Sequence, residues 1–148
     1  MLIKLKLNDE AFNPQFKYAW QSKADFLVLY GGGGSGKSEE IMDKRLLRCM
    51  TEPGHRMVNL RQVGKTIRIA QWLLLKDKIK RWGMEKFWKL RDTEMIATFK
   101  PNGNDILSIG IDDVEKMKSL VEPTDFHLEE ATEVKKQDFL QLVLRLRG

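Results

Sequence analysis

The sequence predicts an α/β fold, a three-layer sandwich with helices on both faces of a largely parallel central sheet. Segments of strand-like alternation take turns with segments of helical periodicity along the 148 residues, and this order is typical of parallel α/β sheets. A glycine-rich loop also lies between an apolar segment, residues 26–30, and a helical segment, residues 37–51. That arrangement is typical of a P-loop nucleotide-binding domain.

The loop is the most specific motif of the chain. It reads Gly31, Gly32, Gly33, Gly34, Ser35, Gly36, Lys37 and Ser38. The glycines let backbone N–H groups point at phosphate oxygens, and the helix that follows adds the positive end of its dipole. We therefore predict that the whole loop binds the phosphates of ATP, with Lys37 at the β- and γ-phosphates and Ser38 as a ligand of Mg²⁺. A flexible linker has no need of Lys and Ser at this spacing.

The elements around the loop are assigned from their apolar patterns. Residues 3–7 alternate apolar residues with lysines, which predicts a half-exposed strand. Residues 26–30 are predicted to form the strand that leads into the loop, and residues 37–51 the helix that leaves it, ended by a Pro-Gly pair. Residues 56–60 are predicted to form the next strand.

A long helix is predicted for residues 66–82, because its large apolar residues recur at helical spacing. They form one stripe that we expect in the core, made of Trp72, Leu75, Ile79 and Trp82. After it, residues 95–99 and 106–111 flank an Asn-Gly pair, which predicts a hairpin.

The last third of the chain returns to alternating helices and strands. We predict a short helix at residues 113–120, a strand at residues 124–129 and a final helix at residues 135–147. No internal repeat or linker divides the sequence, so residues 1–148 are expected to form one domain.

Composition excludes several classes of protein. No apolar stretch approaches the roughly 18 residues of a membrane span, and the N-terminus is too short and too alternating to be a signal peptide. Cys49 is the single cysteine, which excludes an internal disulfide. We therefore expect a reducing cytoplasm, no membrane partner, and Cys49 packed as a small hydrophobic residue.

The formal net charge of +5 hints at affinity for polyanions. Its basic residues concentrate in one stretch, where three aromatic residues are interleaved. The basic residues are Lys76, Lys78, Lys80, Arg81, Lys86, Lys89 and Arg91. Two interpretations stay open, the solvated face of an amphipathic helix and a surface that faces nucleic acid.

A P-loop site needs an acidic partner, and Glu129 and Glu130 follow an apolar strand-like segment. This is the Walker B arrangement. We predict that Glu129 holds Mg²⁺ and that Glu130 orients or deprotonates the attacking water. The second carboxylate favours an NTPase that does mechanical work over a small-molecule kinase. Asp112 and Asp113 form a rival acidic pair, or else cap the helix that follows them.

At this point the sequence resembles the ATPase domain of phage terminase large subunits, the motors that pack DNA into a prohead. The matching segments occur in the family's order and are residues 30–38, 60–62, 110–113, 116–120, 128–133 and 145–148. The P-loop alone is generic. The Glu-Glu-Ala-Thr-Glu segment and the block from Asp112 to Leu120 are more specific.

The resemblance implies a RecA-like ATPase fold and a homo-oligomeric ring around double-stranded DNA in the host cytoplasm. It also implies a small terminase subunit and a portal protein as partners. Arg61 matches an arginine that the family uses near the phosphates, which makes it a third catalytic candidate beside Lys37 and Glu130. The upstream residues Phe16, Tyr18 and Gln21 lie where the family contacts adenine, although core packing is an equal alternative.

The sequence departs from the family in two places. Many relatives carry an arginine inside the P-loop where this chain has Gly33. An arginine finger contributes about 10³–10⁵ in rate, so a neighbouring subunit is expected to supply it, with Arg145 and Arg147 as candidates. The family's next strand and its nuclease domain do not follow Gly148, so we expect a fragment of the large subunit without nuclease activity.

The leading hypothesis is thus an ATP-hydrolysing DNA-packaging motor domain. Two alternatives remain open at this stage. One is another nucleic-acid-dependent P-loop ATPase, such as a helicase or loader. The other is a nucleotide-binding fragment without turnover.

Overall fold

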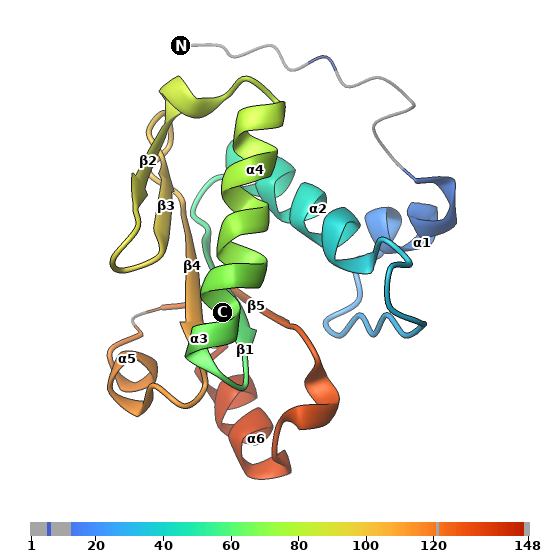
Figure 1. Cartoon of the computed structure of the whole chain (residues 1–148), viewed down its shortest axis with the longest axis vertical. Helices are drawn as coiled ribbons and strands as arrows, with labels where there is room; N and C mark the ends of the chain where they lie inside the picture. The colour runs from blue at the N-terminus through green and yellow to red at the C-terminus, as the bar shows by residue number, and fades with distance from the viewer. Residues whose placement is uncertain (1–5, 7–12, 121, 147–148) are drawn as a thin grey trace.

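The computed structural model describes residues 6, 13–120 and 122–146 (Figure 1). Its helices and strands, in chain order, are η2 (Pro14–Phe16), α1 (Lys17–Gln21), α2 (Lys37–Thr51), β1 (Arg56–Arg61), α3 (Gly64–Ile67), η3 (Arg68–Trp72), α4 (Leu73–Arg81), η4 (Glu85–Phe87), β2 (Trp88–Arg91), β3 (Ile96–Phe99), β4 (Asp105–Gly110), α5 (Val114–Lys118), β5 (Asp125–Leu128), η5 (Ala131–Glu133) and α6 (Lys136–Arg145). The described residues therefore have an α/β fold, as predicted.

The strands form one five-stranded sheet in the order β2-β3-β4-β1-β5. β1 lies between β4 and β5 and runs parallel to both. β2, β3 and β4 pair antiparallel. The sheet is therefore mixed, and the prediction of a largely parallel sheet is wrong for the half that contains the hairpin, because short turns join strands antiparallel.

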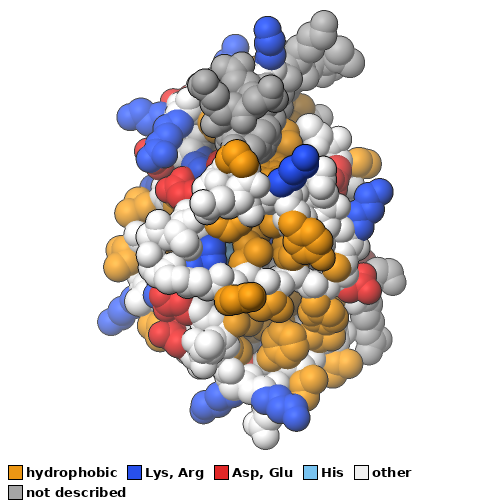
Figure 2. Space-filling view, turned by 90° about the vertical axis from the view of Figure 1, so that its right-hand side faces the viewer, with side chains coloured by type: hydrophobic (Ala, Val, Ile, Leu, Met, Phe, Trp, Pro, Cys, Tyr) orange, Lys and Arg blue, Asp and Glu red, His pale blue; other side chains and the backbone are white. Residues whose placement is uncertain are grey.

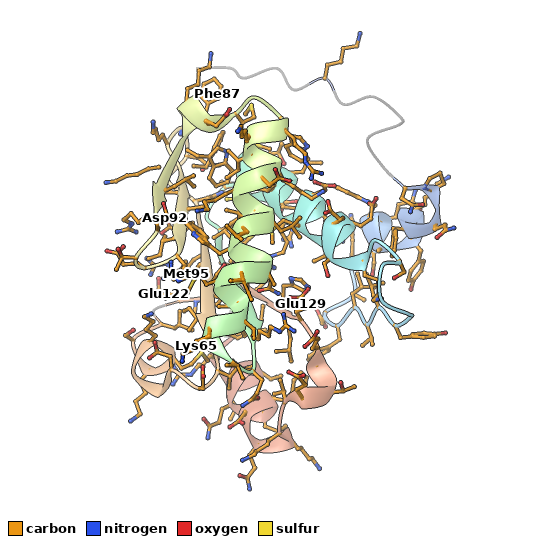
Figure 3. All side chains as sticks on the ribbon, in the orientation of Figure 1. Lys65, Phe87, Asp92, Met95, Glu122 and Glu129 are labelled. Atoms are coloured by element: carbon orange, nitrogen blue, oxygen red, sulfur yellow. The ribbon has the colours of Figure 1, made fainter. Side chains whose placement is uncertain are left out.

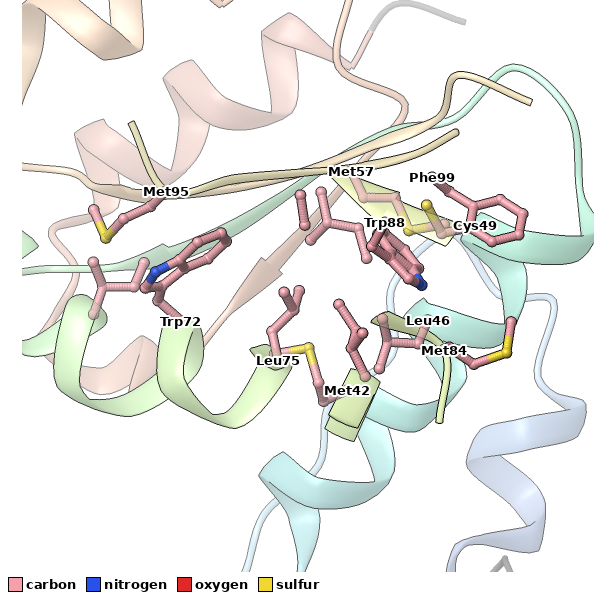
Figure 4. Close-up of a cluster of buried hydrophobic side chains, with 14 residues drawn as sticks. Met42, Leu46, Cys49, Met57, Trp72, Leu75, Met84, Trp88, Met95 and Phe99 are labelled. Carbon is pink, nitrogen blue, oxygen red and sulfur yellow. The ribbon is translucent and has the colours of Figure 1, made fainter. Parts of the chain in front are cut away.

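Helices cover both faces of the sheet, which gives the three expected layers. α2, α3, η3 and α4 pack on one face around a core that contains Met42, Trp72 and Leu75 (Figure 4). The other face carries a smaller cluster that contains Val58 and Leu60 of β1 and Leu142 of α6. Met57 and Val58 belong to opposite clusters because successive side chains of a strand point to opposite faces.

The predicted core stripe of the long helix is confirmed, since Trp72, Leu75 and Ile79 are buried and Trp82 packs against them. The helix itself differs from the prediction in one respect. Residues 68–72 form a π-helical segment between two α-helical segments. Cys49 is fully buried on α2, and burial raises the pKa of its thiol to about 12. Its predicted role as a small hydrophobic residue is thereby confirmed.

The strand predicted before the loop is wrong, because residues 26–30 form no strand. Their alternating side chains are exposed instead, with Phe26 at 60%, Val28 at 79% and Tyr30 at 93% of their full accessibility. β5 is an edge strand of the sheet, yet residues 26–30 do not pair with it. Apolar alternation predicts a strand only where a neighbour supplies the hydrogen bonds.

One predicted strand cannot be compared with the structure, and one observed strand was not predicted. The strand predicted at residues 3–7 lies outside the described residues, apart from Lys6. In contrast, β2 was not predicted, because Lys89 and Arg91 belong to a basic run that has the composition of a helix surface. The basic run is thus divided between α4, η4 and β2.

No helix in the described part of the chain is long and apolar enough to span a membrane.

Candidate functional site

The loop of residues 31–38 lies open at the N-terminus of α2. Gly34 and Gly36 have φ values of +73° and +83°, a left-handed conformation that other residues rarely adopt. A Cβ atom added at Gly32, Gly33 or Gly34 would meet nothing within 4 Å. The backbone of the loop is therefore free to approach a ligand closely.

Lys37 folds back into this loop. Its Nζ atom donates hydrogen bonds to the carbonyl oxygens of Gly31 and Gly32 and to Oγ of Ser35, each at 2.8 Å. All three acceptors are exposed neutral groups. An anion in the loop can therefore compete for the ammonium group without breaking an ion pair.

Ser38 and Glu129 meet although 91 residues separate them in the chain. The Ser38 hydroxyl donates to Oε1 of Glu129 at 2.7 Å. Glu129 directly follows β5, and its backbone N–H donates to the Leu60 carbonyl of β1 at 2.9 Å. The carboxyl end of the sheet thus brings Glu129 to the first turn of α2, as Figure 3 shows from the position of Glu129 on the ribbon.

Arg61 is the last residue of β1, the strand next to β5, and its guanidinium group lies near both acidic residues. Its Nη2 atom donates a short hydrogen bond to Oε2 of Glu130, and its Nη1 atom lies 3.9 Å from Oε2 of Glu129. Glu130 has a φ of +53°, an unusual value for a residue with a side chain. Both predicted acids and Arg61 therefore meet in one cluster beside the loop.

The same cluster fits the predicted cofactors. Oε2 of Glu129 is buried and has no hydrogen-bond partner in the described structure. Because a buried carboxylate oxygen normally accepts a hydrogen bond or binds a cation, this atom is a suitable partner for a Mg²⁺ ion or its water. Among the described residues, no group of three or more His, Cys, Asp or Glu side chains is arranged so that it could hold a metal ion. A cation held by Ser38 and Glu129 would therefore need further ligands from phosphates or water.

The rival acidic pair has structural partners. Oδ1 of Asp112 accepts from the backbone N–H of Gly64 at 2.9 Å. Oδ1 of Asp113 accepts from the backbone N–H of Lys116 at 3.1 Å, and this bond lowers the pKa of the carboxyl group. Asp113 therefore caps α5, as its alternative assignment predicts.

The remaining candidates lie apart from this cluster or outside the description. The Phe16 ring is half-buried and lies near Gly36, at 3.8 Å from the position of an added Cβ. Tyr18 and Gln21 are exposed. Arg145 ends α6 and makes no hydrogen bond or ion pair with the described residues of the loop, and Arg147 lies outside the described residues.

Sequence reasoning missed Glu40, which anchors the segment before the loop. Its two carboxylate oxygens accept from the Asn13 backbone N–H and from Nε1 of Trp20, both at 2.8 Å. Glu40 is buried at 8% exposure. Its position next to Glu39, on an acidic first turn of α2, gave no signal of this role.

His127 on β5 was missed as well. Its Nδ1 atom is buried without a hydrogen-bond partner in the described structure. Burial, aided by the positive charge of Arg45, lowers the pKa of His127 to about 3. The ring is therefore neutral at physiological pH, two residues before Glu129.

An exposed apolar surface also lies on the side of the molecule that carries the loop. Phe26 and Phe139 have ring centroids 6.3 Å apart, which joins the segment before the loop to α6. Figure 2 shows apolar side chains gathered on this side. The exposed large apolar residues of the two segments are Phe26, Val28, Tyr30, Phe139, Leu140 and Leu144.

Comparison with known proteins gives a consistent result. Residues 23–148 match the family model described as phage terminase large subunit. The chain is 35% identical over 121 residues to the terminase large subunit of Bacillus phage SPP1, covering 79% of this chain and 28% of that protein. It is 32% identical over 138 residues to the PBSX phage terminase large subunit of Bacillus subtilis strain 168, covering 91% of this chain and 31% of that protein. The chain thus spans less than a third of the length of either relative.

Proposed function

Because this chain belongs to the phage terminase large subunit family, we propose that it is an ATP-binding and ATP-hydrolysing domain that powers the packaging of double-stranded viral DNA into a prohead. Its fold would be the RecA-like form of the P-loop NTPases. Its partners would be duplex DNA, a small terminase subunit, a portal protein and further copies of the chain in a ring.

The contact between Ser38 and Glu129 is the observation that carries this proposal. It joins the P-loop to the carboxyl end of β5 through a 2.7 Å hydrogen bond. A glycine-rich loop or an acidic strand end is common on its own. Their direct contact supports a nucleotide site, since one half would bind phosphates and the other would hold the cation that accompanies them.

Each residue of the cluster has a role in the proposed reaction. The N–H groups of residues 31–38 bind phosphate oxygens, and Lys37 exchanges its loop acceptors for the β- and γ-phosphates. Ser38 and Glu129 would hold Mg²⁺, directly or through water. Bound Mg²⁺ would neutralise part of the phosphate charge.

Glu130 is the proposed base that orients or deprotonates the attacking water. In the described structure its carboxylate is engaged by Arg61. A phosphate that enters the site would therefore compete with the carboxylates for the Arg61 guanidinium group. Transfer of Arg61 to the phosphate would free Glu130 to accept a proton from water.

The first test is Mg-ATP turnover by this chain, with and without linear duplex DNA. Glu130→Gln is expected to retain ATP binding and to lower turnover by about 10²–10⁴, which is the usual contribution of a general base. Glu133→Gln is the matched control, because Glu133 is an exposed glutamate three residues further along. Turnover that survives in Glu130→Gln would contradict the assigned base.

The second test is ATP binding by Lys37→Ala, measured by fluorescence of a labelled nucleotide. Binding is expected to disappear, since Lys37 supplies the charge of the loop. Lys23→Ala, at an exposed lysine outside the loop, should bind as the unchanged chain does. Equal binding by Lys37→Ala would contradict a P-loop site altogether.

A nucleotide-binding domain without turnover is the second candidate, and the contact between Arg61 and Glu130 favours it. If Arg61 does not release Glu130, ATP is bound but not hydrolysed. Turnover by the unchanged chain excludes this candidate. A helicase or loader would be distinguished by stimulation with single-stranded rather than duplex DNA.

A further inference from the structure

The excess positive charge of the chain is concentrated in one stretch of the sequence. Residues 76–100 contain eight Lys and Arg and four Asp and Glu, so a sixth of the chain carries most of the net charge of +5. These residues include the end of α4, η4, β2 and β3. β2 is one edge of the sheet, and β5, which leads to Glu129, is the opposite edge.

Part of this charge is neutralised within the protein. Lys78 is buried and pairs with Glu39 and Asp43 at 2.6 and 2.7 Å. Lys76 pairs with Asp92 at 2.6 Å, and Arg81 pairs with Asp77 at 2.5 Å. The basic residues of α4 that form these pairs therefore contribute little to a field outside the molecule.

Five exposed basic residues of this stretch have no ion pair among the described residues. One of them, Lys80, lies on α4, and we name the other four the basic edge. They are Lys86, Lys89, Arg91 and Lys100. Lys89 and Arg91 lie on β2, Lys86 on η4 and Lys100 directly after β3. Figure 3 labels Phe87 and Asp92, which flank β2, on the side of the molecule away from Glu129.

The geometry of β2 and its neighbour brings these side chains together. Lys89 and Arg91 are two residues apart on one strand, so they share a face at a spacing of about 7 Å. Thr98 and Ile96 of β3 lie opposite them, so no carboxylate is directly across the strand. Nζ of Lys100 donates to the Lys86 carbonyl oxygen at 2.9 Å, which places Lys100 beside Lys86.

Exposed apolar side chains contribute little to this surface, and this narrows the class of partner. The half-buried Phe87 ring is engaged within the protein, with Nζ of Lys86 4.9 Å from its centroid. Trp88, Leu90 and Phe99 face the core. Among the described residues, none of the exposed large apolar side chains lies within residues 76–100. A single-stranded nucleic acid is normally bound by exposed aromatic side chains that stack on bases, and a membrane by exposed apolar ones. Positive charge without either feature fits the phosphate backbone of a duplex.

We propose that the basic edge binds the phosphate backbone of double-stranded DNA without reading its sequence. The inference shares with the proposed function the premise that the chain acts on duplex DNA. It adds the surface, which lies at the opposite edge of the sheet from the nucleotide cluster. Binding of DNA is therefore measurable without nucleotide, independently of whether ATP is hydrolysed.

The test is the affinity of the chain for a fluorescein-labelled linear duplex, followed by anisotropy between 50 and 200 mM NaCl without nucleotide. In the double variant Lys89→Ala, Arg91→Ala, the slope of log K against log salt should fall by about 1.8, since each lost phosphate contact removes about 0.9. The affinity at the lowest salt concentration should fall by about tenfold or more.

Two further variants separate this role from general charge and from folding. The control Lys135→Ala, Lys136→Ala removes the same charge from exposed residues at the start of α6. Its affinity should stay within about twofold of that of the unchanged chain, and its slope within about 0.3. Lys89→Arg, Arg91→Lys retains the charges and should bind as the unchanged chain does.

Three results would overturn the inference. They are no binding of duplex by the unchanged chain, equal losses in the α6 control, and a loss confined to single-stranded DNA. An unchanged slope in the double variant would overturn it as well. Lys89 and Arg91 would then have the other common role of basic residues on an edge strand, which is to prevent strands of different molecules from pairing. If the unchanged chain binds duplex DNA through the basic edge but does not hydrolyse ATP, the proposed function is contradicted and the present inference is not.

Discussion

The two faces of the sheet are covered to very different extents. The face beneath α2 and α4 buries fourteen apolar residues in one cluster. On the other face, α6 buries Leu142 but leaves Phe139, Leu140 and Leu144 at 41%, 49% and 67% exposure. The first face is a completed core, whereas the second ends in apolar surface next to the candidate site. Stability is therefore expected to come from the first face, and the second is available for further contacts.

Thiol labelling should give the largest contrast between the faces. Leu144→Cys adds an exposed thiol on α6 to the native thiol of Cys49, whose pKa is raised to about 12 from 9.0 by burial. At pH 8 the added thiol should react about a thousandfold faster, because three pKa units change the thiolate fraction by that factor. Mass spectrometry after timed labelling measures both rates. Similar rates would show that the α2 face opens as readily as the α6 face.

Matched leucine truncations should sharpen the comparison in energy. Leu75→Ala on α4 removes a fully buried side chain and should lower the free energy of unfolding by about 2–5 kcal/mol. Leu144→Ala on α6 removes an exposed one and should change it by less than about 0.5 kcal/mol. Urea denaturation of both variants checks the difference. Equal losses would mean that α6 is covered in solution.

The pH dependence of stability tests how completely the His127 ring is buried beneath α2. The pKa of His127 is about 3 in the folded chain and 6.5 in the reference state. Between these values the unfolded chain binds more protons, so stability is complete above pH 6.5 and falls by up to about 1.4 kcal/mol per pH unit as the pH decreases. His127→Gln should remove this part of the slope. The difference between the two denaturation series, from pH 7 to 4.5, cancels the titration of the carboxylates.

The smallest effect is expected for the pair Phe26 and Phe139. A double-mutant cycle with both alanine substitutions should give a coupling of about 0.5 kcal/mol in the free energy of unfolding. Exposed ring pairs lie at the low end of aromatic interaction energies. Urea denaturation of the four proteins provides the measurement. A coupling above about 1.5 kcal/mol would mean that the segment before the loop is as firmly attached as the core.

The predictability of the structure differs between local and long-range features. The loop and α2 could be predicted because eight consecutive residues define the motif and its following helix. The strand at residues 26–30 could not be excluded from sequence, because its apolar pattern is that of a strand and the lack of pairing with the sheet is not a local feature. β2 was hidden because Lys89 and Arg91 occupy its solvent face, so its alternation was attributed to a basic helix.

The candidate site shows the same division. Glu129 and Glu130 were found from an apolar segment that ends in two acids, and the structure brings them to Ser38 and Arg61. The roles of Glu40 and His127 depend on which distant side chains surround them, and no local pattern carries that information. The folded-back position of Lys37 was also unpredictable, because it depends on the carbonyl groups of the loop itself.

The hydrogen bond between Ser38 and Glu129 also has a consequence for the timing of synthesis. Its partners are 91 residues apart, and β1 must pair with β5 before the acid reaches the loop. At about 5–20 residues per second, the ribosome makes Glu129 roughly 5–20 s after Ser38. The loop is therefore exposed to the nucleotides of the cell for that interval before its acidic partner exists, and the two can meet only after long-range parallel pairing, which is a slow class of folding event.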